Sequence, residues 1–414
     1  MAYQTLATAD AILKDLYVGP VIEQLNYKTY MLDQIERDSD HVDFTGRRAI
    51  VPVHAGRNRK RGNISDGGTL PTPGYQTYDD AQIGISYFSQ GISLTDQSIK
   101  QAKNNDGAFI NLLDEETKML AKDMKKDINR QVFNDANTNG TGSGLLSAIT
   151  TGGVGAATIT VASVQYIGVG DPVDILTRAT GAALNATAQN RTVSSIAGLV
   201  VTLDSAITGT TDNTMGVYLA GSYGLEMLGL RHFAKASRTL HGIDSATNTW
   251  WNGRTRSAAG AVAGESLFEQ LIDDVGAGGN GEVDVILTTR GIRRRLADTY
   301  QSQKRFNDAN ATKIHGGYSA IMVNEVPVIA DDDVPRGYAF ALAKDAFKWF
   351  EVEKPDWLKS DDGTVWQMGV SSTASGRRAV WESWMVWYAS LACLAPNRIG
   401  AIPDAADDVA SAAV

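Results

Sequence analysis

A polar stretch between two apolar runs decides the fold of this chain. The first run is Arg48-Ala-Ile-Val-Pro-Val53, and the second is Ile83-Gly-Ile-Ser-Tyr-Phe88, followed by Ile92-Ser-Leu94. Apolar and β-branched runs of this kind predict a strand and its return. The stretch between them is polar and rich in glycine, and it includes Asp66-Gly-Gly-Thr-Leu-Pro-Thr-Pro-Gly74. We therefore expect a long hairpin over residues 46–95, whose tip has no hydrophobic core of its own.

Four cations gather near the tip of this hairpin, namely Arg57, Arg59, Lys60 and Arg61. Like charges this close repel one another unless an acidic surface meets them. Each arm of roughly 23 residues could extend about 75 Å. A compact chain of 414 residues has a radius of gyration of about 22 Å. The tip can therefore pass beyond its own subunit. Two interpretations stay open, a solvated loop or an element that docks on another molecule.

A long helix is predicted after the hairpin. Apolar residues recur at spacings of three and four, with one larger step, at Phe109, Leu113, Leu120, Met124, Ile128 and Val132. Asp106 is the expected N-cap, and acidic residues precede basic ones along the run, as the helix dipole favours. Roughly 28 residues at 1.5 Å each make a helix about 40 Å long. Its early acidic residues, Asp114, Glu115 and Glu116, are the predicted acceptors for the basic tip of a neighbouring copy.

Residues 146–221 differ in composition from the rest of the chain. Short β-branched runs alternate with glycine turns, at Ala157–Val161, Pro172–Leu176, Arg191–Ile196 and Leu199–Leu203. Even spacing with turn signals indicates a small β-barrel or sandwich inserted after the helix. A loop rich in Ser, Thr, Asn and Gly is expected to follow over residues 240–265.

The last third of the chain alternates between helix and strand patterns. Helices are predicted at Glu265–Asp274 and Gly291–Ala297, and strands at Val283–Leu287, Val326–Ile329 and Tyr338–Leu342. Helices packed on a small sheet make an α+β unit. Two further strands rich in Trp and Tyr are expected at Val365–Val370 and Ala379–Leu394.

Composition excludes several function classes. The 414 residues carry a net charge of −9, which argues against non-specific coating of nucleic acid and against a polybasic membrane anchor. One cysteine and five scattered histidines provide neither a disulfide framework nor a metal-ligand spacing. No GxSxG elbow is present, and Gly140–Gly144 lacks the lysine of a phosphate-binding loop. Asp331-Asp-Asp333 is interpreted as a solvated turn. We predict no catalytic, cofactor-binding or metal-binding residue and no membrane segment.

The order of these elements resembles the major capsid proteins of tailed bacteriophages, whose fold is named after phage Hong Kong ninety-seven. The likeness is carried by Arg48–Leu94, Asp106–Phe133, Gly281–Tyr300, Val323–Leu342 and Trp366–Ile402. The resemblance implies an α+β capsid fold with six parts. They are an N-terminal arm (1–45), an extended loop (46–95), a peripheral domain with a spine helix (96–145), an inserted all-β domain (146–221), an axial domain (222–350), and peripheral strands with a C-terminal tail (351–414).

The resemblance also implies a function. Members assemble into hexamers and pentamers of an icosahedral head shell that encloses double-stranded DNA without sequence-specific binding. The implied place is the virion, assembled in the cytoplasm of a bacterial host. The N-terminus shows no coiled-coil segment of scaffold type, so a separate scaffolding protein is expected, with a portal and a decoration protein as further partners. The open alternative is an encapsulin-like nanocompartment shell, and more remote ones are a β-rich carbohydrate-binding protein or a hydrolase.

Overall fold

The computed structural model describes residues 29–32, 41–43, 46, 48–102, 112–137, 140–279, 281–303, 321–360, 363–370 and 377–407. The chain divides into two compact units. The first comprises residues 1–27, 90–124 and 357–385, and the second comprises residues 28–89, 125–356 and 386–414. Strand β4 (Ser86–Thr95), helix α4 (Leu112–Val132) and strand β20 (Arg377–Cys393) each continue from one unit into the other.

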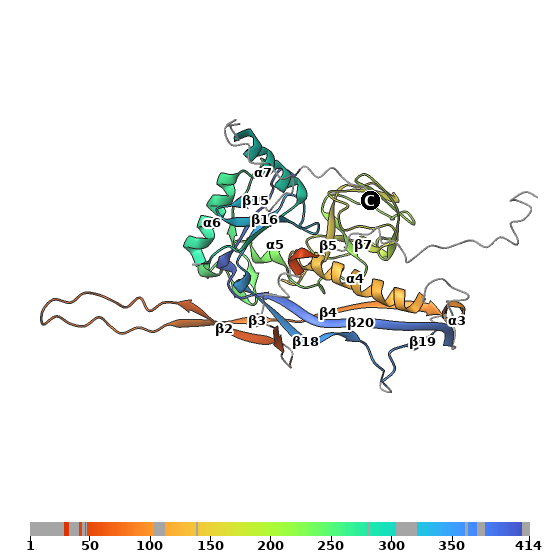
Figure 1. Cartoon of the computed structure of the whole chain (residues 1–414), viewed down its shortest axis with the longest axis horizontal. Coiled ribbons are helices and arrows are strands. Elements are labelled where there is room, and N and C mark those ends of the chain that lie inside the picture. The colour runs from red at the N-terminus through yellow and green to blue at the C-terminus, as the bar shows by residue number, and fades with distance from the viewer. Residues whose placement is uncertain are drawn as a thin grey trace, which may run out of the picture. The chain divides into compact units, whose positions relative to one another are not determined.

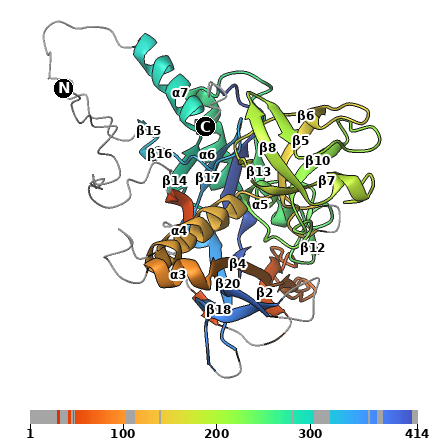
Figure 2. The ribbon, with the colours of Figure 1, turned by 90° about the vertical axis from the view of Figure 1, so that its right-hand side faces the viewer.

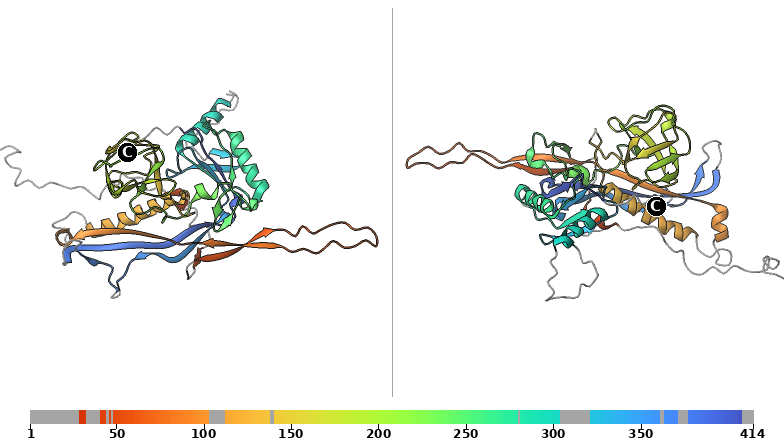
Figure 3. Two further views of the ribbon diagram at one scale, coloured as in Figure 1. Left: turned by 180° about the vertical axis from the view of Figure 1, so that it is seen from behind. Right: turned by 90° about the horizontal axis from the view of Figure 1, so that it is seen from above.

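The hairpin of the second unit is a two-stranded antiparallel ribbon, drawn in orange in Figures 1 and 3. Strand β2 (Ala49–Gly56) pairs with β3 (Thr77–Ile83), with Ala49 opposite Ile83. The predicted return strand was therefore wrong, because Ser86–Thr95 is β4 and pairs with β20 instead. The true return, Thr77-Tyr-Asp-Asp-Ala-Gln-Ile83, is mostly polar because only its last residues are buried. An apolar pattern cannot reveal such a strand.

A five-stranded sheet contains the long strands of the C-terminal part. Its order is β1 (His41–Asp43), β18 (Phe347–Trp357), β20 and β19 (Gln367–Val370), and β4 also pairs with β20. Strand β1 runs parallel to β18, and β19 runs antiparallel to β20. The predicted pair of aromatic strands is confirmed, with a shorter first member. Strand β18 was missed.

Helix α4 has 21 residues, which at 1.5 Å each make it about 32 Å long. The short helix α3 (Asp96–Ala102) precedes it in the chain. Asp106 and Phe109, which carried the expected start of the helix, lie outside the described residues. The periodic positions Leu120, Met124, Ile128 and Val132 are all buried, as predicted.

Residues 145–219 form a closed barrel of six antiparallel strands, in the order β10-β5-β6-β9-β8-β7 (Figure 2). Four of the strands lie on the predicted runs: β6 (Thr158–Val161), β7 (Pro172–Thr177), β8 (Arg191–Ala197) and β9 (Val200–Leu203). Strands β5 (Leu145–Thr151) and β10 (Met215–Leu219) close the ring, and the turn η2 (Ala186–Ala188) lies between β7 and β8. The interior is filled by aliphatic side chains such as Ile149, Val173 and Val217, so the barrel has its own core.

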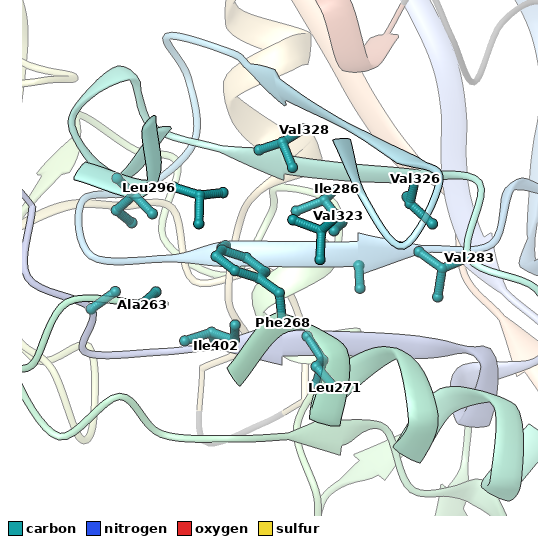
Figure 4. Close-up of a cluster of buried hydrophobic side chains, with 14 of the residues drawn as sticks. Ala263, Phe268, Leu271, Val283, Ile286, Leu296, Val323, Val326, Val328 and Ile402 are labelled. Atoms are coloured by element: carbon teal, nitrogen blue, oxygen red, sulfur yellow. The ribbon is translucent and has the colours of Figure 1, made fainter. Parts of the chain in front are cut away.

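A six-stranded mixed sheet forms the α+β part of the second unit, in the order β13-β21-β17-β14-β16-β15. The strands are β13 (Arg254–Thr255), β14 (Val285–Thr288), β15 (Ile321–Val323), β16 (Val326–Ala330), β17 (Ala339–Leu342) and β21 (Ile399–Ile402). Helices α6 (Glu265–Gly279) and α7 (Arg290–Gln303) share one core with it. Figure 4 shows Phe268 and Leu271 of α6 directed at Ile286 and Ile402 of the strands. Gly400 allows this close packing, because a Cβ there would lie 2.8 Å from the Leu271 side chain.

The segment before α6 is more ordered than a loop. It contains α5 (Leu230–Phe233), the small hairpin of β11 (Thr239–Leu240) and β12 (Ile243–Asp244), and the turn η3 (Thr249–Trp251). Trp251 is fully buried and donates from its indole nitrogen to the Leu240 carbonyl at 3.1 Å. The expectation of a loop over 240–265 was therefore wrong for residues 240–255, which contain short strands and a turn, and right for residues 256–264, which contain neither helix nor strand. Two further turns, η5 (Lys344–Ala346) and η6 (Pro396–Arg398), complete the unit.

Candidate assembly surface

The basic tip is exposed in the structure. Arg57, Arg59, Lys60 and Arg61 all lie at the surface. Local bonds shape the chain around them, since Asn58 N–H donates to Gln76 and Lys60 N–H donates to the Asn58 side chain. Over the described part of the chain, no ion pair joins any of these four cations to a carboxylate. The positive charge is thus available to a second molecule.

The hairpin also exposes large apolar side chains. Ile50, Leu70, Tyr75 and Tyr78 are between 61% and 82% exposed, although a hydrophobic side chain gains free energy when it leaves water. At its base the ribbon is anchored, because Ile83 packs with Phe350 of β18 and Ala392 of β20. A ribbon that is anchored at its base and exposes apolar side chains along its length and charge near its tip is suited to bind a partner.

The predicted acceptors lie on the first turns of α4. Glu116 is exposed and Glu115 is half-buried. The side chain of Asp114 lies outside the described residues. The predicted pairing joins two copies of the chain, so a single chain does not test it, and it stays a prediction.

The turn Asp331–Val334 is a buried junction and not the solvated turn that was expected. Asp331 and Asp333 are 3% and 5% exposed. Asp331 accepts the Met31 N–H at 3.0 Å, and Lys126 of α4 contacts Asp333 at 2.8 Å. Burial raises the pKa of Asp333, and Lys126 acts in the opposite direction. Sequence reasoning missed this role because a run of three aspartates is typical of solvent-exposed turns.

The barrel contacts the same turn through hydrogen bonds. Tyr166 donates its phenolic hydrogen to the Asp333 carbonyl at 2.6 Å. Gln165 donates to the carbonyls of Asp332 and Val334 at 2.7 and 2.8 Å. Burial, with the nearby Asp333 charge, raises the pKa of Tyr166, so this hydroxyl keeps its proton and remains a donor. The barrel is therefore held on the α+β part by specific side chains as well as by its chain connections.

A second buried network connects the end of α4 to the segment after the barrel. Arg130 binds Glu226 through both terminal nitrogens, at 2.7 and 3.1 Å, and Asn134 donates to the same carboxylate at 3.0 Å. The Arg130 Nε also donates to Asp127 at 2.7 Å. Burial opposes the charge on Arg130, but the carboxylates of Asp127 and Glu226 hold its pKa above its ordinary value. A buried bidentate pair of this kind fixes relative orientation.

A histidine holds the base of the hairpin. His241 lies in the turn between β11 and β12 with φ of 53°, and its carbonyl accepts the Gln82 N–H of β3 at 2.7 Å. Its imidazole Nε2 accepts the Cys393 N–H at 3.3 Å, so the ring is neutral. Burial, together with His232 and Arg238, lowers the pKa of His241 to about 3.

A cleft of about 730 Å³ opens beside this histidine, within the second unit. Its lining includes the glycines Gly140, Gly142 and Gly224 and the side chains of Glu226 and His232. Glu226 is already engaged by Arg130, and His232 contacts the Thr239 carbonyl at 3.0 Å. Among the described residues, no group of three His, Cys, Asp or Glu is placed to hold a metal ion. No helix within the same residues has the length and apolarity to span a membrane.

The chain matches no protein-family model and no curated protein. Solved structures do match it over their whole length. The capsid of cyanophage A-1(L) is 13% identical, covers 98% of this chain and 100% of its own, and has a TM-score of 0.62. The capsid of a native GTA particle is 10% identical, with 98% and 100% covered and a TM-score of 0.54. A chain of Mycobacterium phage Bobi is 10% identical, with 97% and 99% covered and a TM-score of 0.51.

At these identities the likeness concerns the fold. This chain has the mixed helix-and-sheet fold of phage capsid proteins. The resemblance inferred from the order of hairpin, helix, α+β unit and aromatic strands is therefore confirmed at the level of the fold.

Proposed function

We propose that this protein is a major capsid protein, which assembles into the hexamers and pentamers of an icosahedral head shell around double-stranded phage DNA. The observation that carries the proposal is the match to the cyanophage A-1(L) capsid, which extends over 98% of this chain and all of that one. A match over both chains supports a shared fold that extends over this whole chain. The role is structural and needs no catalytic residue.

The parts of the chain have the following proposed roles. The β2–β3 hairpin is the extended loop (46–95), and α4 is the spine helix of a peripheral domain that also includes the β18–β20 strands. The six-stranded sheet with α6 and α7 is the centre of the proposed axial domain (222–350), and its strand β21 comes from the segment 351–414, which the sequence assigned to the peripheral domain. The barrel is the proposed inserted domain (146–221). The closed barrel core and the side-chain contacts of Gln165 and Tyr166 support an insertion that folds as a unit and then docks.

The negative net charge of the chain supports a role as a container for DNA. The net charge of −9 repels DNA phosphates, so a shell of this protein would confine DNA without gripping it. Its proposed location is the virion capsid, after assembly in the cytoplasm of a bacterial host. A separate scaffolding protein, a portal and a decoration protein are the proposed partners.

The basic tip is the proposed contact between subunits. Four exposed cations without carboxylate partners among the described residues support docking on a neighbouring copy. Asp114, Glu115 and Glu116 at the start of α4 are the acceptors that the sequence nominates.

Electron microscopy and light scattering of the purified protein test the function. We expect closed particles of uniform size, alone or after co-expression with the neighbouring genes. A monodisperse monomer or dimer under every such condition would contradict the proposal and favour the carbohydrate-binding or hydrolase alternatives. Closed particles that enclose a cargo protein in place of DNA would favour the encapsulin-like shell.

A further inference from the structure

The two outer edges of the β2–β3 ribbon differ. In an antiparallel pair, the main-chain groups of successive residues point alternately toward the partner strand and away from it. The Gln82 N–H donates to the His241 carbonyl, so residue 82 points away from β2. Asp80 and Tyr78, two and four residues before Gln82, therefore also point away from β2. The residues opposite Gln82, Asp80 and Tyr78 point away from β3 in the same way, and they are Ile50, Pro52 and His54.

The edge of β2 is closed to strand pairing. Pro52 has no N–H, and it stands at one of the outward-pointing positions. Proline on an edge strand prevents a further strand from completing its hydrogen bonds. The local ladder tolerates Pro52 because the missing N–H would have faced away from β3.

The edge of β3 is open. Beyond Gln82, no main-chain partner for the outward N–H and C=O of Tyr78 and Asp80 occurs among the described residues. Both residues are exposed. Unpaired edge groups of this kind are a template for the addition of another strand.

The charges of this edge select the added strand. Asp79 and Asp80 are consecutive, so one carboxylate lies on each face of the ribbon. A second β3 edge paired here would place aspartates close to aspartates, which is unfavourable. Residues 57–61 carry the complementary charge, because Arg57, Arg59, Lys60 and Arg61 are all exposed cations.

Part of the main chain of residues 57–61 is available as well. The N–H groups of Arg57 and Arg59 have no main-chain partner among the described residues, whereas the Arg59 carbonyl accepts the Arg61 N–H at 3.0 Å. Asn58 N–H points across the hairpin to Gln76 at 3.0 Å. By the same alternation, the N–H groups of Arg57 and Arg59 point outward. Within one chain these cations lie on the other arm, beyond the end of β2, and have no ion pair with Asp79 or Asp80 among the described residues.

We propose that the open edge of β3, at residues 78–80, binds residues 57–59 of a second copy of this chain as an added strand, with the cations of Lys60 and Arg61 directly after it. The inference rests on the proposed capsid function and names the contact that would link neighbouring subunits. Each chain has one acidic open edge and one basic segment, so the contact is head-to-tail. Head-to-tail contacts close into rings when the rotation between copies allows it, as hexamers and pentamers require. The edge is thus an alternative acceptor to the acidic residues of α4.

A proline substitution on the β3 edge tests the strand pairing. Asp80→Pro removes the outward N–H and leaves the β2–β3 ladder intact, as Pro52 does on the other strand. Asp80→Ala, the matched control, keeps the N–H and removes the charge. We expect Asp80→Pro to lower the yield of particles at least tenfold in sedimentation and electron microscopy, and Asp80→Ala to lower it less. Thermal unfolding of the unassembled subunit verifies that both variants fold.

A charge exchange tests the identity of the added strand and does not depend on proline. Asp79→Lys with Asp80→Lys should prevent assembly, and adding Arg59→Glu and Lys60→Glu in the same chain should restore it. Normal particles from the folded Asp80→Pro variant would overturn the strand pairing. Failure of the exchange, with rescue of Arg59→Glu and Lys60→Glu by Glu115→Lys and Glu116→Lys, would overturn the choice of strand. If the wild-type chain forms no particles, the capsid function itself fails, which is a separate result.

Discussion

At the scale of single residues, buried polar groups decide how the pieces of the second unit fit together. Arg130 and Glu226 join the end of α4 to the segment after the barrel, and Asp333 receives both Lys126 and the barrel residue Tyr166. Buried charges are costly unless they are paired and hydrogen-bonded. Each of these groups meets that requirement through a partner distant in sequence. The networks can therefore form only when the unit is correctly folded.

Removing one partner of the buried ion pair should lower the free energy of unfolding. Glu226→Gln keeps the shape of the side chain but leaves Arg130 with one carboxylate fewer, and the loss of a buried partner costs about 3–5 kcal/mol. Urea unfolding of the unassembled subunit measures the change. The matched control is Glu116→Gln on exposed surface, where about 0.5 kcal/mol or less is expected. Equal effects of the two substitutions would contradict a stabilising role for the pair.

His241 should make stability depend on pH. In the folded protein its pKa is about 3, whereas a histidine in an unfolded chain titrates near roughly 6.5. The unfolded state therefore binds a proton first, so the contribution is fully present above about pH 6.5 and is lost as the pH falls toward about 3. His241→Gln keeps an acceptor for the Cys393 N–H but cannot titrate.

Thermal unfolding at pH 7, 6, 5 and 4 measures this dependence. The melting temperature of His241→Gln should fall less with decreasing pH than that of the wild type. Replacing the exposed His54 by Gln is the control, and it should follow the wild-type curve. Parallel curves for His241→Gln and wild type would show that other groups control the acid sensitivity.

At the scale of elements, the barrel is the most self-contained part of the chain. Its six strands close without a free edge, and its aliphatic core is separate from the core beneath α6 and α7. Closure satisfies every strand within the barrel, which is why it needs no neighbouring sheet. It contacts the rest of the unit at the turn 331–334, through Gln165 and Tyr166, and at the segment that follows it, where Tyr218 packs against Tyr223.

We therefore expect the excised barrel, residues 143–222, to fold alone. Circular dichroism should show β structure and a cooperative thermal transition. A fragment that lacks the closing strand, residues 143–212, is the control and should not fold, because the loss of β10 exposes the edges of β5 and β7. A random-coil spectrum for residues 143–222 would show that the barrel depends on its docking site.

At the scale of the whole molecule, the proposed role of the hairpin is a contact outside its own subunit. It is anchored at Ile83, while its outer part exposes Leu70, Tyr75 and the basic tip. One exposed ion pair contributes little to stability. A shell repeats the contact in every subunit, however, so a small loss per copy can prevent closure.

Charge reversal of the tip should separate folding from assembly. Arg59→Glu with Lys60→Glu should leave the melting temperature of the subunit nearly unchanged, because neither side chain has a partner within it among the described residues. The same variant should form no shells at physiological salt. The matched control is Arg59→Lys with Lys60→Arg, which keeps the charge and should assemble. Normal shells from the reversed variant would mean that the tip is merely solvated.

The sequence by itself determined the features that depend on local pattern. Periodic apolar residues predicted the buried face of α4, and glycine-punctuated β-branched runs predicted β6 to β9. Their order was sufficient to predict the fold. Each of these signals lies within a window of a few residues, since helix and strand periods are properties of the chain itself.

Only the tertiary structure decided the features whose partners are distant in the chain. The polar strand β3 carries no strand pattern, because β2 supplies its hydrogen bonds and little of it is buried. In the sequence, Asp331 and Asp333 have the pattern of a solvated turn. In the structure, α4, the barrel and residue 31 surround them. Burial and pairing depend on residues tens to hundreds of positions away, so no local pattern can encode them.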